Sequence, residues 1–417
     1  MAMTALEGVG RQPLLGLGLR PTYRDATRAA RVGASDYSLS WNDDGSYHAL
    51  MATGIPFHEP GVPRLGPMGG AEPEVNFFLQ STREIAVAAR TNVNLWYSRI
   101  SDPTLSLLKR LRDDNSNVHR SALDELFVNE LLRRQFWRIE YEEELGAPDF
   151  RLYDTDSYLA GLEVLSLFGR SDWEAEHYQH ARIADELNRR LVADRWFIHF
   201  EIIHLDREPP IRKLADWVQR TTRALAAEKI SVMHDEPIPP ATFASEGVLL
   251  KFDFIPRTST GELSADRIVG MGALTGGFVN SGRRLKVALT GKAGSKYKLL
   301  GGPYAPCVVL HDFFCSDEQV LDALYGTEQI ELASMKWQRA SNGLFGLGKN
   351  GGKNQRVSCV YVVKNWLPWA PDEVTISRFD NPFCAAEYPE PILQPQAWFR
   401  RVLSDNGSIH LDWQAEI

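Results

Sequence analysis

The sequence lacks the signatures of membrane and secreted proteins. It contains no run of about 18 apolar residues, the length that a membrane-spanning helix requires. The first residues, MAMTALEGVGRQPLLGLGLRP, have no basic region followed by a continuous apolar stretch and a cleavage site. We therefore expect a soluble, cytoplasmic protein with no membrane partner.

Cysteine is scarce, and its spacing does not suggest a metal site. The chain of 417 residues has four cysteines, and no two of them form a C-x-x-C pair. Neither a zinc knuckle nor a disulfide framework is indicated, and reduced thiols are the simpler interpretation. The four are Cys307, Cys315, Cys359 and Cys384.

Common loop motifs of catalysis are missing as well. Residues 343–354, GLFGLGKNGGKN, are glycine-rich and basic, but they lack G-K-[ST], which argues against a P-loop. No G-x-S-x-G nucleophile motif is present, and we find no internal repeat. A flexible connection is the better explanation of the glycine-rich segment, and contact with a nucleic-acid backbone is the alternative.

Positive charge is in deficit over the whole chain. The formal net charge of −8 argues against a protein that coats nucleic acid everywhere, but it allows a local basic groove. Two segments, 283–298 and 336–356, carry several basic residues and no acid. Such runs are usually solvated surface, and phosphate contact is the alternative. The candidate nucleic-acid-binding residues are Arg283, Arg284, Lys286, Lys296, Lys298, Lys349, Lys353 and Arg356.

The length and the hydrophobic content of 44% are sufficient for a large buried core. Composition divides the chain into four parts. We expect an irregular, partly disordered N-terminal segment over 1–75, a helical region over 76–119, a core over 120–315 and a C-terminal extension packed on that core over 316–417.

Within the core, helical and strand patterns alternate, which indicates an α/β or α+β fold with one mixed sheet. The helix over 121–144 is expected to begin at Ser121 as N-cap, because Leu123, Leu126 and Phe127 follow at helical spacing. Further helices are predicted over 175–194, 211–229, 283–297 and 317–325, and strands over 195–205, 247–257, 306–314 and 355–363.

The stretch GAPDFRLYDTDSYLAGLEVLSLF, residues 146–168, reads as two strands around a turn, and each strand contains an acid. If the chain turns at Asp156, Phe150 lies opposite Leu162, and Asp149 lies opposite Glu163. Two carboxylates that are directly opposed converge, and their repulsion requires a nearby positive charge. A divalent cation such as Mg²⁺ or Mn²⁺ could supply it, and so could a basic side chain such as Arg151.

A plainer interpretation is that these acids lie on the exposed face of an edge hairpin. The segment VLSLF after Glu163 is apolar on both faces, however, which favours a strand covered on both sides. Glu125 is a third candidate ligand, because it lies at the border of an apolar helical stripe. A surface role for Glu125 is equally consistent with that position.

This order of a helix with Glu125, a strand after Pro148-Asp149, a turn, a strand with Glu163, and then a helix and a strand resembles the PD-(D/E)xK superfamily of restriction-endonuclease-like nucleases. The resemblance implies that Asp149 and Glu163 bind Mg²⁺ and that Glu125 is the additional helical acid. A lysine two residues after the second acid normally positions or activates water, but Leu165 occupies that position here.

A broader likeness covers most of the chain from about residue 105 onward. Segments such as RIADELNRRL, KAGSKYKLLGGPYAPCVVL and NPFCAAEYPEP resemble, in the same order, a group of uncharacterised bacterial proteins. The likeness implies a shared fold and leaves the activity open. That group has a lysine-bearing helix before the PY…V strand, which makes Lys292, with Lys296 as the alternative, the candidate for the catalytic cation.

These observations lead to one main hypothesis and two competing ones. We expect a restriction-endonuclease-like core, with a mixed central sheet flanked by helices, in a Mg²⁺- or Mn²⁺-dependent nuclease that acts on nucleic acid, with DNA favoured. Asp149, Glu163 and Lys292 would be catalytic, and Glu125 would join the two acids as a metal ligand. The alternatives are an inactive nucleic-acid-binding or interaction module of the same fold, and a partner-binding protein that uses the Pro- and Trp-rich tail; a homodimer is left open.

Overall fold

The computed structural model describes most of the chain from Gly54 onward, and these residues form one unit. The expected irregular segment over 1–75 therefore lies mostly outside the described residues. The described ranges are 54–60, 63–135, 138–141, 146–169, 171–191, 196–227, 238–256, 268–271, 280–294, 302–312, 315–332, 335–349, 351–389, 392–403 and 409–415.

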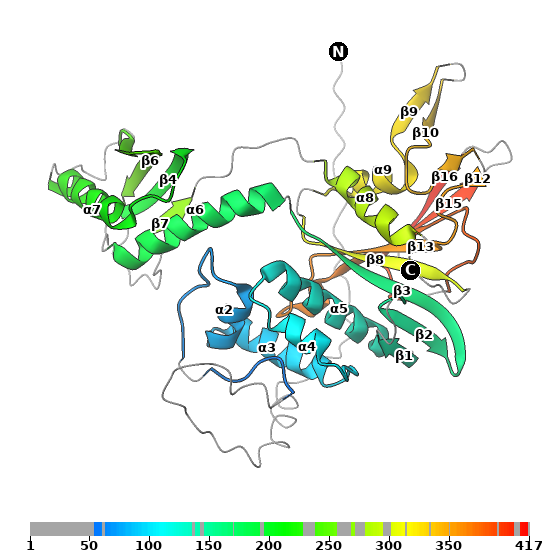
Figure 1. Ribbon diagram of the computed structural model, residues 1–417. Coiled ribbons are helices and arrows are strands. Elements are labelled where there is room, and N and C mark those ends of the chain that lie inside the picture. Colours follow the sequence, from blue (N-terminus) through cyan, green and yellow to red (C-terminus); the bar gives the residue numbers. More distant parts are fainter. Residues whose placement is uncertain are drawn as a thin grey trace, which may run out of the picture. The chain divides into compact units, whose positions relative to one another are not determined.

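A mixed sheet of eight strands, in the order β1-β2-β3-β8-β13-β14-β15-β16, contains the predicted hairpin (Figure 1). The three neighbours β3, β8 and β13 are parallel, whereas β1, β2 and β3 pair antiparallel. The strands are β1 Arg138–Tyr141, β2 Phe150–Asp154, β3 Ser157–Leu167, β8 Tyr304–Leu310, β13 Cys359–Lys364, β14 Thr375–Asp380, β15 Ala397–Leu403 and β16 Ile409–Ala415.

A second sheet of four strands is inserted in the chain between β3 and β8. Its order is β5-β6-β4-β7, and it has its own apolar core together with two helices. The elements are α6 Ser171–Arg190, β4 Trp196–Leu205, α7 Ile211–Ala227, β5 Ala241–Ser245, β6 Val248–Pro256 and β7 Val269–Met271.

The strands expected in one mixed sheet over 120–315 therefore divide between two sheets, and the C-terminal extension supplies half of the larger one. Burial explains the division. β4 and β6 alternate between buried and more exposed positions, as strands with one covered face do. β8 is buried at every position, as a central strand covered on both faces should be.

Helices cover both faces of the larger sheet. Val164 of β3 belongs to the apolar cluster that includes α5, whereas Leu165 packs against the cluster that includes α8 and α9. Successive strand residues point to opposite faces, so α5 lies on one face and the pair α8 and α9 on the other. The helices are α2 Glu74–Gln80, α3 Glu84–Tyr97, α4 Ser106–Leu111, α5 Ser116–Arg134, α8 Ser281–Ala293 and α9 Asp317–Tyr325.

The helix expected over 121–144 differs from α5 at both ends. The N-cap is Asn115, whose side chain accepts hydrogen bonds from the backbone N–H groups of Asn117 and Val118, and Ser121 lies inside α5. The chain also leaves the helix at Arg134 and forms β1, because pairing with β2 satisfies its backbone.

The predicted hairpin register is confirmed along most of β2. Phe150 pairs with Leu162 and Leu152 with Ala160, as expected. The register shifts by one residue beyond Leu152, so that the turn is formed by Thr155 and Asp156. Thr155 adopts a left-handed backbone conformation with φ of 57°.

Strands β14 to β16 were not predicted, because the segments around them, such as WLPWAP and NPFCAAEYPEP, are rich in Pro and aromatic residues and suggested an irregular tail. Within the described part of the chain, no helix has the length and apolar character needed to cross a membrane.

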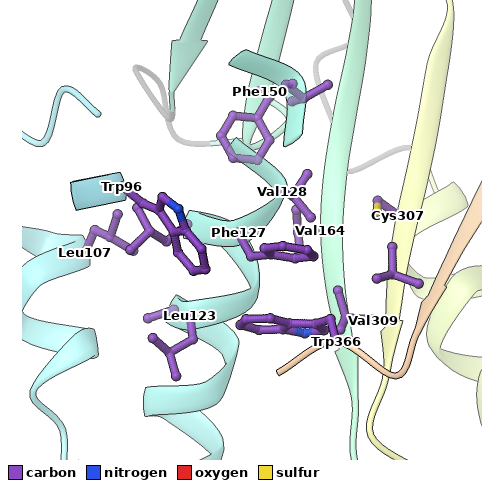
Figure 2. Packing of buried hydrophobic residues seen from close by; sticks show 14 of the residues in the cluster. Trp96, Leu107, Leu123, Phe127, Val128, Phe150, Val164, Cys307, Val309 and Trp366 are labelled. Atoms are coloured by element: carbon purple, nitrogen blue, oxygen red, sulfur yellow. The ribbon is translucent and has the colours of Figure 1, made fainter. Parts of the chain in front are cut away.

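Aromatic packing joins α5 to the segment that follows β13. The rings of Phe127 and Trp366 stack with centroids 4.4 Å apart and an interplanar angle of 3° (Figure 2). Both side chains are buried, and Trp96 also packs against Phe127, with the ring centroids 5.7 Å apart. Trp366 is therefore a core residue.

We expect Phe127→Ala to lower the free energy of unfolding by about 3–5 kcal/mol, because it leaves a cavity beside Trp366. Urea denaturation followed by circular dichroism measures this decrease. Leu95→Ala is the control, since Leu95 is 46% exposed on α3 and its truncation should change stability by no more than about 0.5 kcal/mol. Equal decreases in the two variants would contradict the stacking of Phe127 in the core.

Candidate functional site

The two acids of the hairpin meet where β2 begins. Asp149 is the residue immediately before β2, and Glu163 lies in the middle of β3. The backbone N–H of Asp149 donates to Glu163 Oε2 at 3.3 Å, and the backbone N–H of Val164 donates to Asp149 Oδ2 at 2.7 Å. The Asp149 carboxylate thus continues the hydrogen bonding of β3 beyond the end of the β2 ladder.

Pro148 and Gly161 fix the local path of the chain beside these acids. A side chain at position 161 would bring its Cβ within 2.9 Å of Pro148 Cγ and 3.0 Å of the Tyr158 hydroxyl. Glycine is therefore required for this close approach. The proline before Asp149 packs across the β3 backbone and holds Asp149 at the strand end.

Lys292, in the last turn of α8, supplies the positive charge at the site. Its ammonium donates a hydrogen bond to Glu163 Oε1 and forms an ion pair with it. The Glu163 side chain is only 4% exposed, whereas that of Lys292 is 28% exposed. Leu165 cannot supply a cation, but it packs in the apolar cluster that contains Leu285 and Leu289 of α8. That packing holds the helix that carries Lys292 against β3.

The electrostatic balance at the site is unfavourable for a second negative charge. Burial raises the pKa of Asp149 well above its ordinary value, and the charges of Glu163 and Glu125 raise it further. The hydrogen bond from Val164 N–H and the charge of Lys292 act in the opposite direction. One lysine thus offsets only part of the repulsion that the acids create.

Glu125 lies on α5 close enough to influence Asp149, but its carboxylate already has partners. Arg110 of α4 donates to both of its oxygens, and the Tyr141 hydroxyl donates to Oε2 at 2.7 Å. Within the ranges that the structure describes, no group of three or more His, Cys, Asp or Glu residues is arranged to hold a metal ion. Asp149 and Glu163 lie close enough for the charge of Glu163 to raise the pKa of Asp149.

The two basic segments meet at consecutive backbone carbonyls. Lys286 of α8 donates to the carbonyl of Asn342, and Lys353 of the glycine-rich segment donates to the carbonyl of Ser341 at 2.7 Å. Among the described residues, neither lysine forms an ion pair with an acid. We refer to Lys286 and Lys353 as the lysine pair.

The other candidate basic residues differ in their surroundings. Arg284 is engaged inside the fold, because it donates to Asp312 and to the backbone carbonyls of Phe168 and Gly169. These contacts give Arg284 a structural role, and its place among the nucleic-acid-binding residues stays a prediction. Arg283, Lys349 and Arg356 are exposed, and Lys296 and Lys298 lie outside the described residues.

A buried polar cluster around Asp124 had no counterpart among the sequence-based expectations. This carboxylate is fully buried and accepts hydrogen bonds from the Ser166 hydroxyl, from His311 Nε2 at 2.8 Å and from Trp366 Nε1 at 2.8 Å. The donors are 42, 187 and 242 residues away in the sequence. No local spacing could reveal the cluster, and only the fold brings its members together.

Comparison with known proteins adds no assignment: no family model, curated protein or solved structure matches the chain.

The raised pKa of Asp149 has a consequence for stability. Because the folded state binds this proton more tightly than the unfolded state, the group stabilises the fold fully only below its unfolded pKa, and that contribution is lost as pH rises through the folded pKa. Asp149→Asn removes the ionisation but keeps an oxygen that can accept the Val164 N–H. We expect it to raise the free energy of unfolding at pH 7 by about 1 kcal/mol or more.

Urea titrations between pH 4 and pH 8 in the presence of EDTA measure this effect. Asp156→Asn is the matched control, because Asp156 lies in the same hairpin with its side chain 91% exposed. It should leave the pH profile almost unchanged. A native-like profile for Asp149→Asn would show that Asp149 is not electrostatically strained.

Proposed function

We propose that this protein is a divalent-metal-dependent phosphodiesterase that cleaves nucleic acid, with DNA as the favoured substrate. The observation that carries the proposal is the convergence of Asp149, Glu163 and Lys292 from three separate elements at one end of β2. Two adjacent carboxylates with one cation beside them form a combination suited to metal-assisted attack on a phosphate.

The donor atoms fit a hard cation such as Mg²⁺ or Mn²⁺. Both acids offer carboxylate oxygens, and Mg²⁺ is commonly held by one or two carboxylates together with waters and substrate phosphate. The raised pKa of Asp149 reflects, besides burial, a repulsion that a divalent cation would relieve. When bound, the cation would supply an activated water and stabilise charge on the phosphate. Asp149 and Glu163 would hold it, and Glu125 would contribute its charge while remaining bound to Arg110.

The protein's own groups have distinct roles in this proposal. Val164 N–H orients the Asp149 carboxylate, and Lys292 orients Glu163 through the opposite oxygen. The Lys292 ammonium is partly exposed, so it is also available to neutralise a phosphate oxygen at the same site. Lys292 would thereby supply the positive charge that Leu165 cannot.

The element order is consistent with a restriction-endonuclease-like core. α5 precedes the hairpin of β2 and β3, and α8 leads into β8, which pairs with β3 in parallel. The helix and strand that follow the hairpin directly, α6 and β4, belong to the inserted sheet instead. In this proposal α8, which carries Lys292, takes the place of the helix that follows the hairpin in the superfamily.

Nucleic acid is the favoured polymer because of the lysine pair. Two ammonium groups that converge on neighbouring carbonyls repel each other unless an anion lies between or beside them. Lys286 lies in the middle of the helix whose last turn carries Lys292, so a polyanion that contacts the last turn of α8 can extend to its middle. Phosphates along a nucleic-acid backbone meet this requirement.

A second candidate function is a nucleic-acid-binding or interaction module with no catalytic activity. The specific observation in its favour is that Lys292 already forms an ion pair with Glu163, which gives the acids a structural partner. In that case the chain would bind nucleic acid through the lysine pair and leave it intact.

Cleavage assays with single- and double-stranded DNA and RNA, in Mg²⁺ or Mn²⁺, test the enzymatic proposal. We expect the native chain to cleave and the rate of Asp149→Ala to be at least about a hundredfold lower. Lys292→Ala should slow cleavage by a comparable factor, and Lys292→Arg should recover part of it, because the positive charge returns. Asp154→Ala is the control, since Asp154 is an exposed acid at the far end of β2.

Equal cleavage by the native chain and Asp149→Ala would exclude this site as the source of activity. Binding without cleavage under every condition would favour the inactive module.

Replacing both members of the lysine pair should weaken binding without altering the fold. We expect Lys286→Gln with Lys353→Gln to lower the affinity for DNA and to reduce the slope of log K against log salt by about one for each phosphate that is no longer neutralised. Fluorescence anisotropy at several salt concentrations measures both quantities. Lys251→Gln, in the inserted sheet and paired with Glu201 at 3.7 Å, is the control and should bind as the native chain does. An unchanged salt slope in the double variant would contradict the assignment.

A further inference from the structure

A hairpin that follows α9 exposes an unusual set of apolar side chains. It consists of β9 Glu328–Glu331 and β10 Lys336–Arg339, which pair antiparallel and form a separate two-stranded sheet (Figure 1). Near its tip, Leu332 is 83% exposed, Met335 73% and Trp337 69%. Soluble surfaces seldom gather large apolar side chains in this way without a binding role.

The body of the hairpin adds to the apolar tip and carries no net charge. Trp337 lies opposite Ile330, which is itself 42% exposed. The two acids of β9 each occupy a register position opposite a base of β10, since Glu328 pairs with Arg339 and Glu331 with Lys336. A polyanion would therefore not be repelled by this element.

The base of the hairpin is hydrogen-bonded to α9 and to the residues that follow it. Arg339 donates to Asp322 of α9 at 3.1 Å and to the Gly326 carbonyl at 2.7 Å. The backbone N–H of Ala340 donates to the Thr327 carbonyl at 2.9 Å. An isolated two-stranded hairpin is only marginally stable in water. These hydrogen bonds at the base therefore stabilise the hairpin.

The same base leads directly to the lysine pair. Ser341 and Asn342 follow β10 within three residues, and their carbonyls are the acceptors of Lys353 and Lys286. The Asn342 side chain also accepts from the backbone N–H of Thr327, at the start of β9, at 3.0 Å. The lysine pair and the exposed apolar surface are thus adjoining parts of one structural unit.

We propose that this hairpin tip receives unpaired nucleobases, so that the substrate is a nucleic acid with a single-stranded or frayed segment. The proposal rests on the proposed function, because it takes the lysine pair as the contact for the phosphate backbone. Trp337 stacks on a base, and Leu332 and Met335 pack against its neighbour. The site therefore selects strands whose bases are accessible over intact duplex.

The chemistry of the surface favours nucleobases over other partners. Stacking on an aromatic ring beside a cationic groove is how proteins hold single strands of varied sequence. Apolar side chains can also enter a duplex between base steps, but only where the bases unstack. An anionic membrane would be disfavoured by the net charge of −8.

Fluorescence anisotropy with a labelled single strand, the same strand in a blunt duplex, and a duplex with one frayed end tests the inference. The measurements use the full chain with Asp149→Asn in EDTA, so that cleavage does not interfere. We expect tighter binding to the single-stranded and frayed probes. Trp337→Ala should lower their affinity roughly tenfold, the effect of removing one base stack, and change blunt-duplex binding little.

Leu65→Ser is the matched control, because Leu65 is 77% exposed and lies outside the hairpin. It should bind all three probes as the parent does. The inference is overturned if Trp337→Ala binds the single strand normally or if it weakens all probes equally. It is also overturned if the hairpin instead causes self-association or binding to anionic vesicles, detected by sedimentation and abolished in the same variant.

The two proposals fail separately. If binding prefers single strands because of Trp337 and the native chain never cleaves, the inference about the hairpin is supported and the enzymatic proposal is rejected. If cleavage depends on Asp149 and Trp337→Ala binds normally, the enzymatic proposal is supported and the inference about the hairpin is rejected.

Discussion

The buried carboxylate of Asp124 is the interaction on which the arrangement of this fold depends. It takes hydrogen bonds from β3, from the residue after β8 and from the segment after β13, and it thereby attaches α5 to three neighbouring strands. Hydrogen bonds to a charged group contribute about 1.5–3 kcal/mol each, and a buried carboxylate without them would be very unfavourable. The stacked rings of Phe127 and Trp366 reinforce the same contact, because Trp366 is also one of the donors.

The position of Asp124 also determines the direction in which the next residue of α5, Glu125, points. Adjacent helical residues point about 100° apart, so a helix whose Asp124 faces the strands must direct Glu125 elsewhere. Glu125 is directed toward Arg110 and Tyr141, and its charge still reaches Asp149. The electrostatic strain at the candidate site is therefore a consequence of how the core is assembled. Lys292 offsets only part of that strain, and in the proposed function a divalent cation would offset the rest.

Sequence patterns predicted those parts of the fold that depend on local spacing. The register of Phe150 against Leu162 followed from alternation, and the start of α7 and both ends of α9 agree with the helices predicted from sequence. The position of Lys292 beside Glu163 came from a resemblance and not from spacing, since the two are 129 residues apart. Other features depend on tertiary packing, which overrides local preference and leaves no periodic signal in the sequence. They are the contacts of Asp124, the closeness of Lys286 and Lys353, and the separation of the second sheet.

The inserted sheet explains why the cation can come from so distant a position. The chain leaves the larger sheet after β3, forms a unit with its own apolar core, and returns as α8. Because each doubling of a connecting loop costs only about 0.6 kcal/mol, the number of residues between Glu163 and Lys292 hardly affects their meeting. What matters is that α8 packs on β3, and Leu165 contributes to that packing through the cluster of Leu285 and Leu289. A lysine at position 165 would place a charge in that apolar cluster. A leucine on β3 therefore suits the packing, while the lysine on α8 supplies the positive charge.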